Sequence, residues 1–219
     1  MIRLKLLVEG QTEETFVRDV LAPHYSFQQI FIEPIIILTS PGHHGGVKHY
    51  GKIRHQLVRL CREDPGCFIS TLFDLYGLPS DFPGKIDAEY PATGTGAQKA
   101  VYLEHQWEED IDEANFISNL LIHEFEALLF TNTEKFAYWI DNASSAIASL
   151  KMTAQQYDTP EEINDNPQTA PSKRIQAVMP NYKKTLHGPL IAADIGLDSI
   201  RQACPHFQSW LQKIETLAE

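Results

Sequence analysis

The sequence predicts an α/β fold, a mostly parallel sheet flanked by helices, because strand-like apolar runs alternate with segments of helical periodicity. Four runs are short, apolar and rich in β-branched or aromatic residues, at 2–8, 30–38, 68–73 and 116–122. After about residue 124 such runs stop and only helical patterns follow. We therefore expect an α/β core over residues 1–130 and a helical C-terminal subdomain over 131–219.

The elements of the core follow one another in a βαβαβαβ order. The first strand leads into a helix for which Thr12 is the expected N-terminal cap. The second run, 30–38, is apolar enough to form a strand that is buried on both faces. Helices are expected within 48–62 and 97–112, where apolar residues recur at helical spacing. The stretch 75–96, rich in Pro, Gly and Asp, predicts a long loop, which in a compact domain is more often functional than idle.

The C-terminal part predicts a series of helices without strands between them. They are expected near 125–130, 143–157, 172–179, 197–203 and 207–218. The segment 164–171, with Asn, Asp and two prolines, interrupts the series. Ser172 is the expected N-terminal cap of the helix that follows it.

Composition limits the class of protein. The chain has 219 residues, a hydrophobic fraction of 43% and no apolar run long enough to cross a bilayer, so we expect a cytoplasmic protein with no membrane contact. Three cysteines without metal-type spacing indicate reduced thiols. A dedicated DNA-binding module is normally basic, whereas the formal charge here is -11. Any contact with nucleic acid would need a local patch, a metal-filled acidic site or a partner.

Acidic residues stand where two predicted strands end. Glu9 and Glu13 bracket the first strand-to-helix turn, and Asp74 ends the third strand. Because the ends of parallel strands meet along one sheet edge, these carboxylates could share one or two Mg²⁺ or Mn²⁺ ions. A bound ion could activate water and stabilise a phosphoryl group. The alternative is structural: acids favour the first turn of a helix, and Asp is common in turns.

Two more acids close the last predicted strand. If His123-Glu124-Phe125-Glu126 stays extended, Glu124 and Glu126 share one face and could complete a second metal position. If a helix starts there, the two are exposed first-turn acids. The sequence favours the two interpretations about equally.

Other polar groups give weaker signals. His43 and His44 lie in a glycine-rich loop, where adjacent histidines are more often exposed than metal-ligating. Lys173 and Arg174 begin a predicted helix, where the helix dipole disfavours cations. That conflict indicates an anionic partner, and a solvated basic pair is an equal alternative.

The stretch from Val8 to Val17, with its Glu-Gly-Gln-Thr-Glu-Glu core, resembles the opening of TOPRIM domains, in particular those of OLD-family nucleases and a related family of uncharacterised bacterial proteins. The stretches 73–79, 123–126 and 164–175 resemble that uncharacterised family, over nearly the whole chain. The resemblance implies a TOPRIM-like core with a divalent-metal site. By it Glu9 and Glu13 match the motif glutamates, and Asp74 matches the first aspartate of Asp-x-Asp. Tyr76 stands where the second aspartate is expected, so two-metal catalysis would need Glu124 or Glu126 as the missing ligand.

Two functions follow as expectations. One is a Mg²⁺- or Mn²⁺-dependent nuclease or phosphodiesterase, with Glu9 as central ligand or general base and Glu13 and Asp74 as ligands. Lys173, Arg174 and Tyr76 would then bind phosphate or substrate. The resemblance also implies a partner ATPase in bacterial defence against phage. The other function is a catalytically inactive sensor or interaction module, in which the helical subdomain docks onto another protein. The sequence does not set the oligomeric state.

Overall fold

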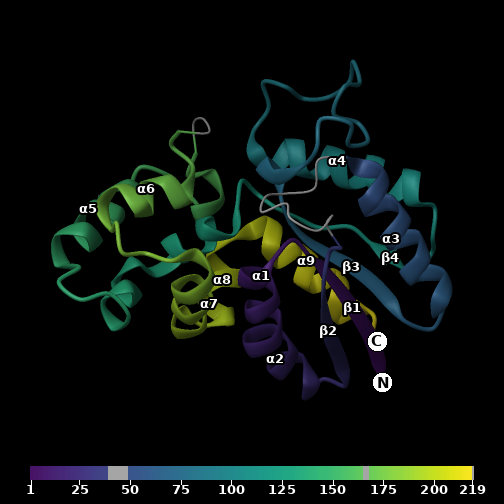
Figure 1. The fold of residues 1–219 in the computed structure, drawn as a ribbon, viewed down its shortest axis with the longest axis horizontal. Coiled ribbons are helices and arrows are strands. Elements are labelled where there is room, and N and C mark those ends of the chain that lie inside the picture. The colour runs from purple at the N-terminus through teal and green to yellow at the C-terminus, as the bar shows by residue number, and fades with distance from the viewer. Residues whose placement is uncertain (39–48, 165–167, 219) are drawn as a thin grey trace.

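The structure is a computed structural model that describes residues 1–38, 49–164 and 168–218. The expected α/β fold is confirmed: a parallel sheet is flanked by helices, and a helical region follows it in the chain (Figure 1). His43 and His44 lie outside the described residues, so their expected exposure stays a prediction.

The sheet places the first strand at its centre. Its strands are β1 (Ile2–Val8), β2 (Ile30–Ile36), β3 (Phe68–Asp74), β4 (Phe116–Ile117) and β5 (Leu120–Leu121). The order is β2-β1-β3-β4, with β5 also paired to β3, and every pairing is parallel. The expectation that residues 30–38 are buried on both faces is wrong, because β2 is an edge strand and Phe31 and Ile36 are exposed.

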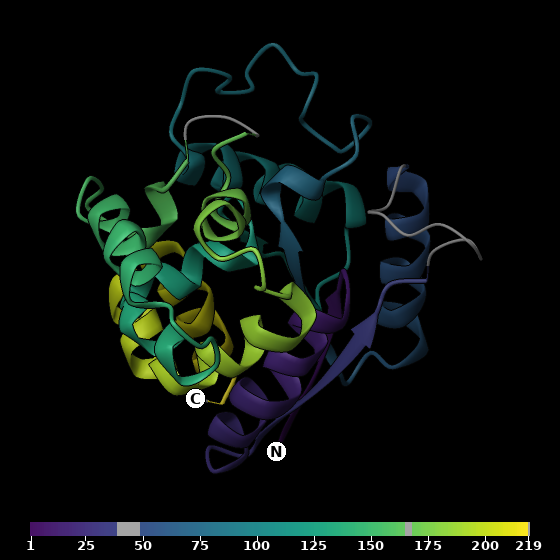
Figure 2. The same ribbon diagram turned by 60° about the vertical axis from the view of Figure 1, so that its left-hand side comes forward.

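Alternation along β1 sends its side chains into two hydrophobic clusters. Leu4, Leu6 and Val8 face one cluster, and Leu7 faces the other. The second cluster is covered by α3 (Tyr50–Glu63) and α4 (Gly96–Ile111). The first is covered by the short helices after β1, namely α1 (Gln11–Phe16), the π-helical η1 (Val17–Leu21) and α2 (Ala22–Ser26), and by C-terminal helices. Figures 1 and 2 show these two layers on opposite sides of the sheet.

The C-terminal region is helical, as expected, but among its described residues it holds one α-helix that the sequence did not indicate. Its elements are η3 (Phe125–Tyr138), α5 (Ser144–Ala154), η4 (Pro160–Glu162), α6 (Pro171–Val178), α7 (Lys184–Ile195), α8 (Leu197–Ala203) and α9 (Pro205–Thr216). The unexpected one is α7, which contains Gly188 and Pro189. Residues of 1–130 and 131–219 share the first hydrophobic cluster, and the boundary between them stays a prediction. Within the described ranges, no helix is long and apolar enough to cross a membrane.

Two expected helix caps are wrong. Gly10, and not Thr12, is the N-terminal cap of α1, and Thr12 is buried. Ala170 caps α6, because Pro171 already occupies its first turn, where proline is well tolerated. Ser172 is therefore inside the helix, with its hydroxyl and N–H directed at Glu124.

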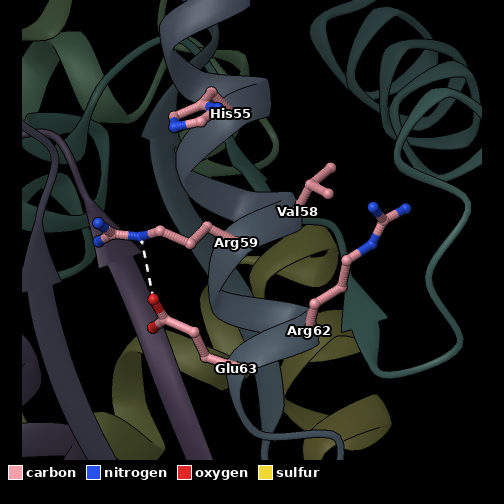
Figure 3. A pocket seen from close by; sticks show the side chains of 5 residues that line it. All are labelled: His55, Val58, Arg59, Arg62 and Glu63. Atoms are coloured by element: carbon pink, nitrogen blue, oxygen red, sulfur yellow. Dashed lines mark ion pairs between the residues drawn. The ribbon is translucent and has the colours of Figure 1, made fainter.

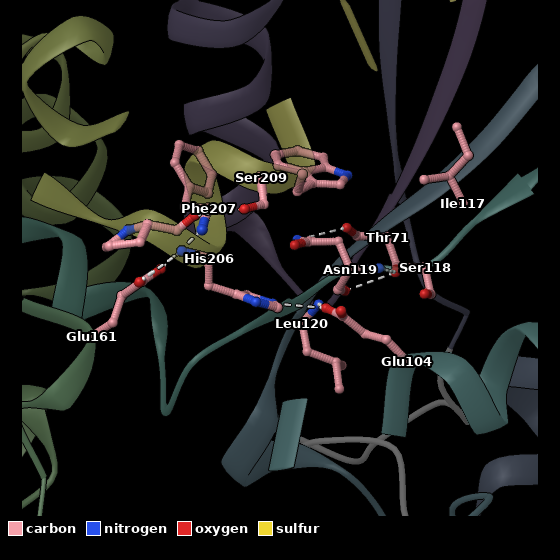
Figure 4. A network of polar contacts seen from close by, with 12 residues as sticks. Thr71, Glu104, Ile117, Ser118, Asn119, Leu120, Glu161, His206, Phe207 and Ser209 are labelled. Atoms are coloured by element: carbon pink, nitrogen blue, oxygen red, sulfur yellow. Dashed lines mark hydrogen bonds and ion pairs between the residues drawn. The ribbon is translucent and has the colours of Figure 1, made fainter. Parts of the chain in front are cut away.

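The strand expected at 116–122 is broken in the middle by polar side chains. The Thr71 hydroxyl donates to the Asn119 carbonyl at 2.8 Å and accepts from the Asn119 N–H at 3.0 Å. Nearby, Glu104 accepts hydrogen bonds from the Leu120 N–H at 2.7 Å and from His206 Nε2 at 2.9 Å (Figure 4). These bonds replace part of the regular ladder between β3 and its neighbour, so two short strands form in place of one.

Candidate functional site

The ends of β1 and β3 bring the predicted carboxylates together at one sheet edge. The two strands are neighbours and pair Val8 with Leu72, so Glu9, just after β1, lies beside Asp74, the last residue of β3. Glu13 follows in the first turn of α1. The short helix η2 (Leu75–Gly77) then carries the chain away from the edge.

Backbone hydrogen bonds tie three segments to these carboxylates. The Asp74 N–H donates to Glu9 Oε1 at 3.1 Å, and the Phe125 N–H donates to Asp74 Oδ1 at 2.9 Å. The Gly10 N–H donates to Glu13 Oε2 at 3.1 Å. The turn after β1, the end of β3 and the start of η3 are therefore held together through the acids themselves.

Glu126 joins the group from the start of η3. Its side chain is fully buried, and its Oε1 accepts from the Tyr182 hydroxyl at 3.3 Å. Its Oε2 is paired with Lys184 Nζ at 3.0 Å and has no other hydrogen-bond partner among the described residues. We call Glu9, Glu13, Asp74 and Glu126 the carboxylate cluster.

The chain starts a 3-10 helix at Phe125, with Glu124 as its N-terminal cap, so the segment is not extended there. Glu124 nevertheless reaches the margin of the cluster. Its Oε2 accepts from the Ser172 hydroxyl at 3.0 Å and lies 3.4 Å from Lys184 Nζ. Both glutamates are buried, so neither is the exposed first-turn acid that the helical alternative described.

Lys184, at the start of α7, is the residue of this edge that sequence reasoning missed. It forms ion pairs with Glu124 and Glu126, and its side chain keeps 38% of its surface exposed. Burial by itself lowers the pKa of Lys184, but Glu126, Glu124 and Asp74 together raise it above its ordinary value. The ammonium is therefore held in its charged form by the acids around it.

One lysine does not balance the cluster. Burial, then the charge of Glu13, raise the pKa of Glu9 to about 8, although the Asp74 N–H and Lys184 oppose the shift. Burial raises the pKa of Asp74 well above its usual range, and Glu9, Glu13 and Glu126 add to the shift. Burial also raises the pKa of Glu126 to about 7, against the effect of Lys184. Carboxyl groups crowded at low dielectric tend to keep their protons, and the cluster would release these protons to solvent when a cation binds.

Tyr76 and His123 form an aromatic pair beside the cluster. Their ring centroids are 5.2 Å apart, and the Tyr76 N–H donates to the His123 carbonyl at 3.1 Å. His123 has a left-handed backbone, with φ of 68°, which is uncommon outside glycine and often marks a functional site. Burial, then Lys99, lower the pKa of His123 to about 4, so its ring is neutral at pH 7. Tyr76 keeps 43% of its surface exposed, so a substrate could reach it.

Gly77 is packed against the first carboxylate. A Cβ atom at Gly77 would lie 2.9 Å from both Oε1 and Oε2 of Glu9, which is closer than real Cβ contacts. Only a glycine lets the backbone of η2 approach Glu9 this closely. The position of the Glu9 carboxylate therefore depends on the absence of a side chain at Gly77, the residue after Tyr76.

The two basic residues of α6, Lys173 and Arg174, differ in their surroundings. Lys173 is exposed. Arg174 is engaged within the chain, because its Nε donates to the Thr169 carbonyl at 2.7 Å and its Nη2 to the Tyr157 hydroxyl at 3.1 Å. Binding of phosphate by the two residues stays a prediction.

The donor types of the cluster suit a hard divalent cation, because all are carboxylate oxygens, and the buried Glu126 Oε2 is paired only with Lys184 Nζ. Among the described residues, no three Asp, Glu, His or Cys side chains already converge as metal ligands do. Glu9, Glu13 and Asp74 could hold an ion after rotation of their side chains, with Glu126 as a fourth donor.

Comparison with known proteins shows the family. A family model described as a domain of unknown function, DUF4276, matches residues 8–215, and the chain belongs to that family. No curated protein matches it. A solved structure, the C-terminal region of the Xanthomonas campestris pv. campestris OLD protein, is similar at 15% identity with a TM-score of 0.48, over 99% of this chain and 94% of that one.

Proposed function

We propose that this chain is a divalent-metal-dependent nuclease or phosphodiesterase of TOPRIM type, and that it acts with a partner ATPase in defence against phage. The observation that carries the proposal is the carboxylate cluster, whose members raise one another's pKa at the carboxyl ends of β1 and β3. The TOPRIM-like motif around Glu9 and Glu13 supports the same chemistry.

The residues of the chain would share the work as follows. Glu9, Glu13 and Asp74 would bind Mg²⁺ or Mn²⁺, with Glu126 or Glu124 in place of the carboxylate that Tyr76 does not supply. The ion, when bound, would activate water and neutralise charge on the phosphoryl group. Glu9 would act as the central ligand or as the general base. Tyr76, Lys173 and Arg174 would contact the substrate.

The first test is hydrolysis of linear DNA, circular DNA and RNA by the purified chain, with Mg²⁺, Mn²⁺ or EDTA, alone and with a partner ATPase. Glu9→Gln and Asp74→Asn should each lower the rate at least about 100-fold, the scale on which charge stabilisation in an active site operates. Glu109→Gln is a matched control, because that side chain is 61% exposed on α4. Absence of metal-dependent hydrolysis under every condition would refute the proposal, as would full activity in Glu9→Gln.

A second readout is metal binding without turnover. A cation that binds only the folded chain at 100 times its dissociation constant stabilises it by about 2.7 kcal/mol. We expect Mn²⁺ to raise the melting temperature of the wild type, EDTA to reverse the rise, and Glu9→Gln to abolish it. Unchanged melting of the wild type in saturating Mn²⁺ would contradict a metal site.

A catalytically inactive sensor or interaction module is the second candidate, and a specific observation favours it. Tyr76 stands at the position of an expected ligand, and the Lys184 ammonium already lies among the acids, where it supplies part of the missing positive charge. This candidate predicts stable association with a partner that Glu9→Gln leaves unchanged, and no metal-dependent cleavage.

A further inference from the structure

Four residues of α3 form a basic stripe on the side of the helix that faces away from the sheet. Lys52, His55, Arg59 and Arg62 follow one another at spacings of three, four and three residues, which places them on one side of an α-helix. All four are exposed. The opposite side of α3, which includes Ile53, Leu57 and Leu60, is buried in the second hydrophobic cluster. We call these four residues the α3 stripe.

Helix α3 is unusually basic for this chain, and three of its four Lys or Arg residues belong to the stripe. Helix α3 holds four Lys or Arg residues and a single Glu, a formal charge of +3, whereas the whole chain carries -11. Random scatter of 18 basic residues over 219 positions would place one or two in this helix. A local basic patch is what a net acidic chain requires to meet a polyanion.

The surface is hollowed along the stripe. His55, Val58, Arg59, Arg62 and Glu63 line an open hollow of about 410 Å³, and Figure 3 shows their side chains along the outer side of α3. Val58, which is half-buried, adds an apolar group to the lining. A sugar or base edge could lie against it while phosphates meet the guanidinium groups.

Ion pairs within the chain leave these arginines available. Arg59 Nε lies 3.4 Å from Glu63, and Arg62 Nε lies 2.6 Å from Glu113. Each pair uses one face of a guanidinium that has five N–H donors, and the side chains remain 49% and 71% exposed. The Arg59–Glu63 pair is exposed on both sides, and such pairs contribute about 1 kcal/mol or less, so a phosphate can replace Glu63 at small cost. The Glu113 side chain is only 19% exposed, so Arg62 would keep that pair and meet a phosphate with its other N–H groups.

The stripe begins near the carboxylate cluster's edge of the sheet. The Gln56 side chain accepts from the Leu38 N–H, just beyond the end of β2, and the Tyr50 N–H donates to Asp81 in the loop after η2. From Lys52 to Arg62 the helix rises by about 15 Å. Phosphates of one strand follow one another at about 3.4 Å along a duplex axis, so the stripe can meet several of them.

We propose that the α3 stripe binds the phosphate backbone of a nucleic-acid strand and leads it towards the carboxylate cluster. This proposal rests on the proposed function, because it names nucleic acid as the substrate class of the carboxylate cluster and gives the path by which the strand reaches it. Arg59 and Arg62 supply the main phosphate contacts, and Lys52 and His55 add donors nearer the cluster.

The test measures binding separately from cleavage. Fluorescence anisotropy of labelled single-stranded DNA, duplex DNA and RNA is recorded in EDTA over a series of salt concentrations. The double variant Arg59→Gln/Arg62→Gln should bind about 10-fold more weakly, and the slope of log affinity against log salt should fall by about 1.5, since each lost phosphate contact accounts for 0.7 to 0.9. Both residues are exposed, and a circular dichroism melt checks that the variant is folded.

Arg18→Gln is the matched control. Arg18 is also an exposed, ion-paired arginine, with 53% of its side chain exposed, but it lies on η1 in the other layer of the structure. Its loss should leave affinity and salt slope unchanged. An equal loss in this variant, unchanged binding in Arg59→Gln/Arg62→Gln, or no binding by the wild type would each overturn the stripe. Competition by polyglutamate as strong as that by DNA would overturn nucleic acid as the ligand.

The two proposals fail in different ways. Glu9→Gln should retain binding and lose cleavage, whereas the stripe variant should lose both at low substrate concentration and regain cleavage at high concentration. Binding through the stripe without any cleavage would refute the nuclease alone. Cleavage that the stripe variant leaves unchanged at every substrate concentration would refute the stripe alone.

Discussion

Two groups of buried acids in this chain are held in different ways. Glu104 accepts from the Leu120 N–H and from His206, and Glu161 accepts from the N–H groups of His206 and Phe207, each at 2.9 Å, at the start of α9 (Figure 4). In the carboxylate cluster, by contrast, each acid also accepts a hydrogen bond, but the acids lie close to one another and share one lysine. Glu13 and Glu126 are buried like Glu104 and Glu161, whereas Glu9 and Asp74 are half-buried.

The two groups differ in how closely their negative charges are crowded. Glu104 and Glu161 join α4, β5, η4 and α9, so their removal leaves buried donors without acceptors. Neutralising one member of the cluster, as in Glu9→Gln, instead relieves repulsion and keeps an oxygen that can accept from the Asp74 N–H. Loss of an acid should therefore lower stability in the first group. In the carboxylate cluster, loss of a charge should raise stability but weaken ligand binding.

The largest expected effect is at Glu104, in the first of the two groups. Glu104→Ala leaves the Leu120 N–H and His206 without their acceptor and should lower the free energy of unfolding by about 3 kcal/mol. Urea unfolding followed by circular dichroism measures the change. Glu109→Ala, in the same helix but exposed, should change it by less than about 0.5 kcal/mol. Similar values for both variants would remove the contrast between the groups.

The next effect is a pH dependence of the cluster. The pKa of Glu9 is raised to about 8 in the folded chain from an ordinary value of 4.5, so between these values the folded state holds a proton that the unfolded state has lost. The stability from this group is present below pH 4.5 and is lost as pH rises towards 8.

The variant Glu9→Gln removes the pH-dependent contribution of Glu9 to stability. The difference in free energy of unfolding between Glu9→Gln and the wild type should shift in favour of the variant as pH rises from about 5 to 8, and saturating Mn²⁺ should reduce the shift. Urea titrations at several pH values give the difference. A constant difference across this range would show that Glu9 is not protonated in the folded chain.

The smallest expected effect comes from Gly77→Ala. The added Cβ would displace the Glu9 carboxylate, from which it would be only 2.9 Å away, and should weaken Mn²⁺ binding by about 1 kcal/mol, or 5-fold. Isothermal titration calorimetry measures the affinity. Gly51→Ala in α3 has open space at its Cβ and should leave the affinity unchanged while stabilising the helix slightly. Equal affinities in both variants would show that Gly77 does not position Glu9.

The sequence was sufficient to predict the sheet edge. Short apolar runs predicted the strands, and parallel pairing made Glu9 and Asp74 neighbours. The same reasoning misjudged β2, because composition does not say which strand lies at an edge. It also took 116–122 as one strand, because the hydrogen bonds of Thr71 and Asn119 that break it join residues far apart in the chain.

The missed part of the site has one physical cause. Gly188 and Pro189 stand together inside α7, and both residues lower the expectation of a helix. Yet Gly188 is where α7 packs closely, since a Cβ there would lie 3.2 Å from the Tyr182 hydroxyl. Lys184 was overlooked with its helix. The sequence signal for Lys184 is only that this lysine stands two residues before the apolar Leu186. Such a pattern is too common to identify a binding site by itself.

The position of α9 has a consequence for how the chain folds while it is being synthesised. Trp210 donates from Nε1 to the Ser70 hydroxyl on β3 at 3.0 Å, and Glu215 accepts from the Tyr25 hydroxyl at 3.1 Å. Leu211 and Ile214 close the same hydrophobic cluster that holds Leu4 of β1. A ribosome therefore releases the first strand some 200 residues before the helix that covers it. We expect the nascent sheet to expose an apolar face until the last helix emerges, which makes this chain a natural client of chaperones during translation.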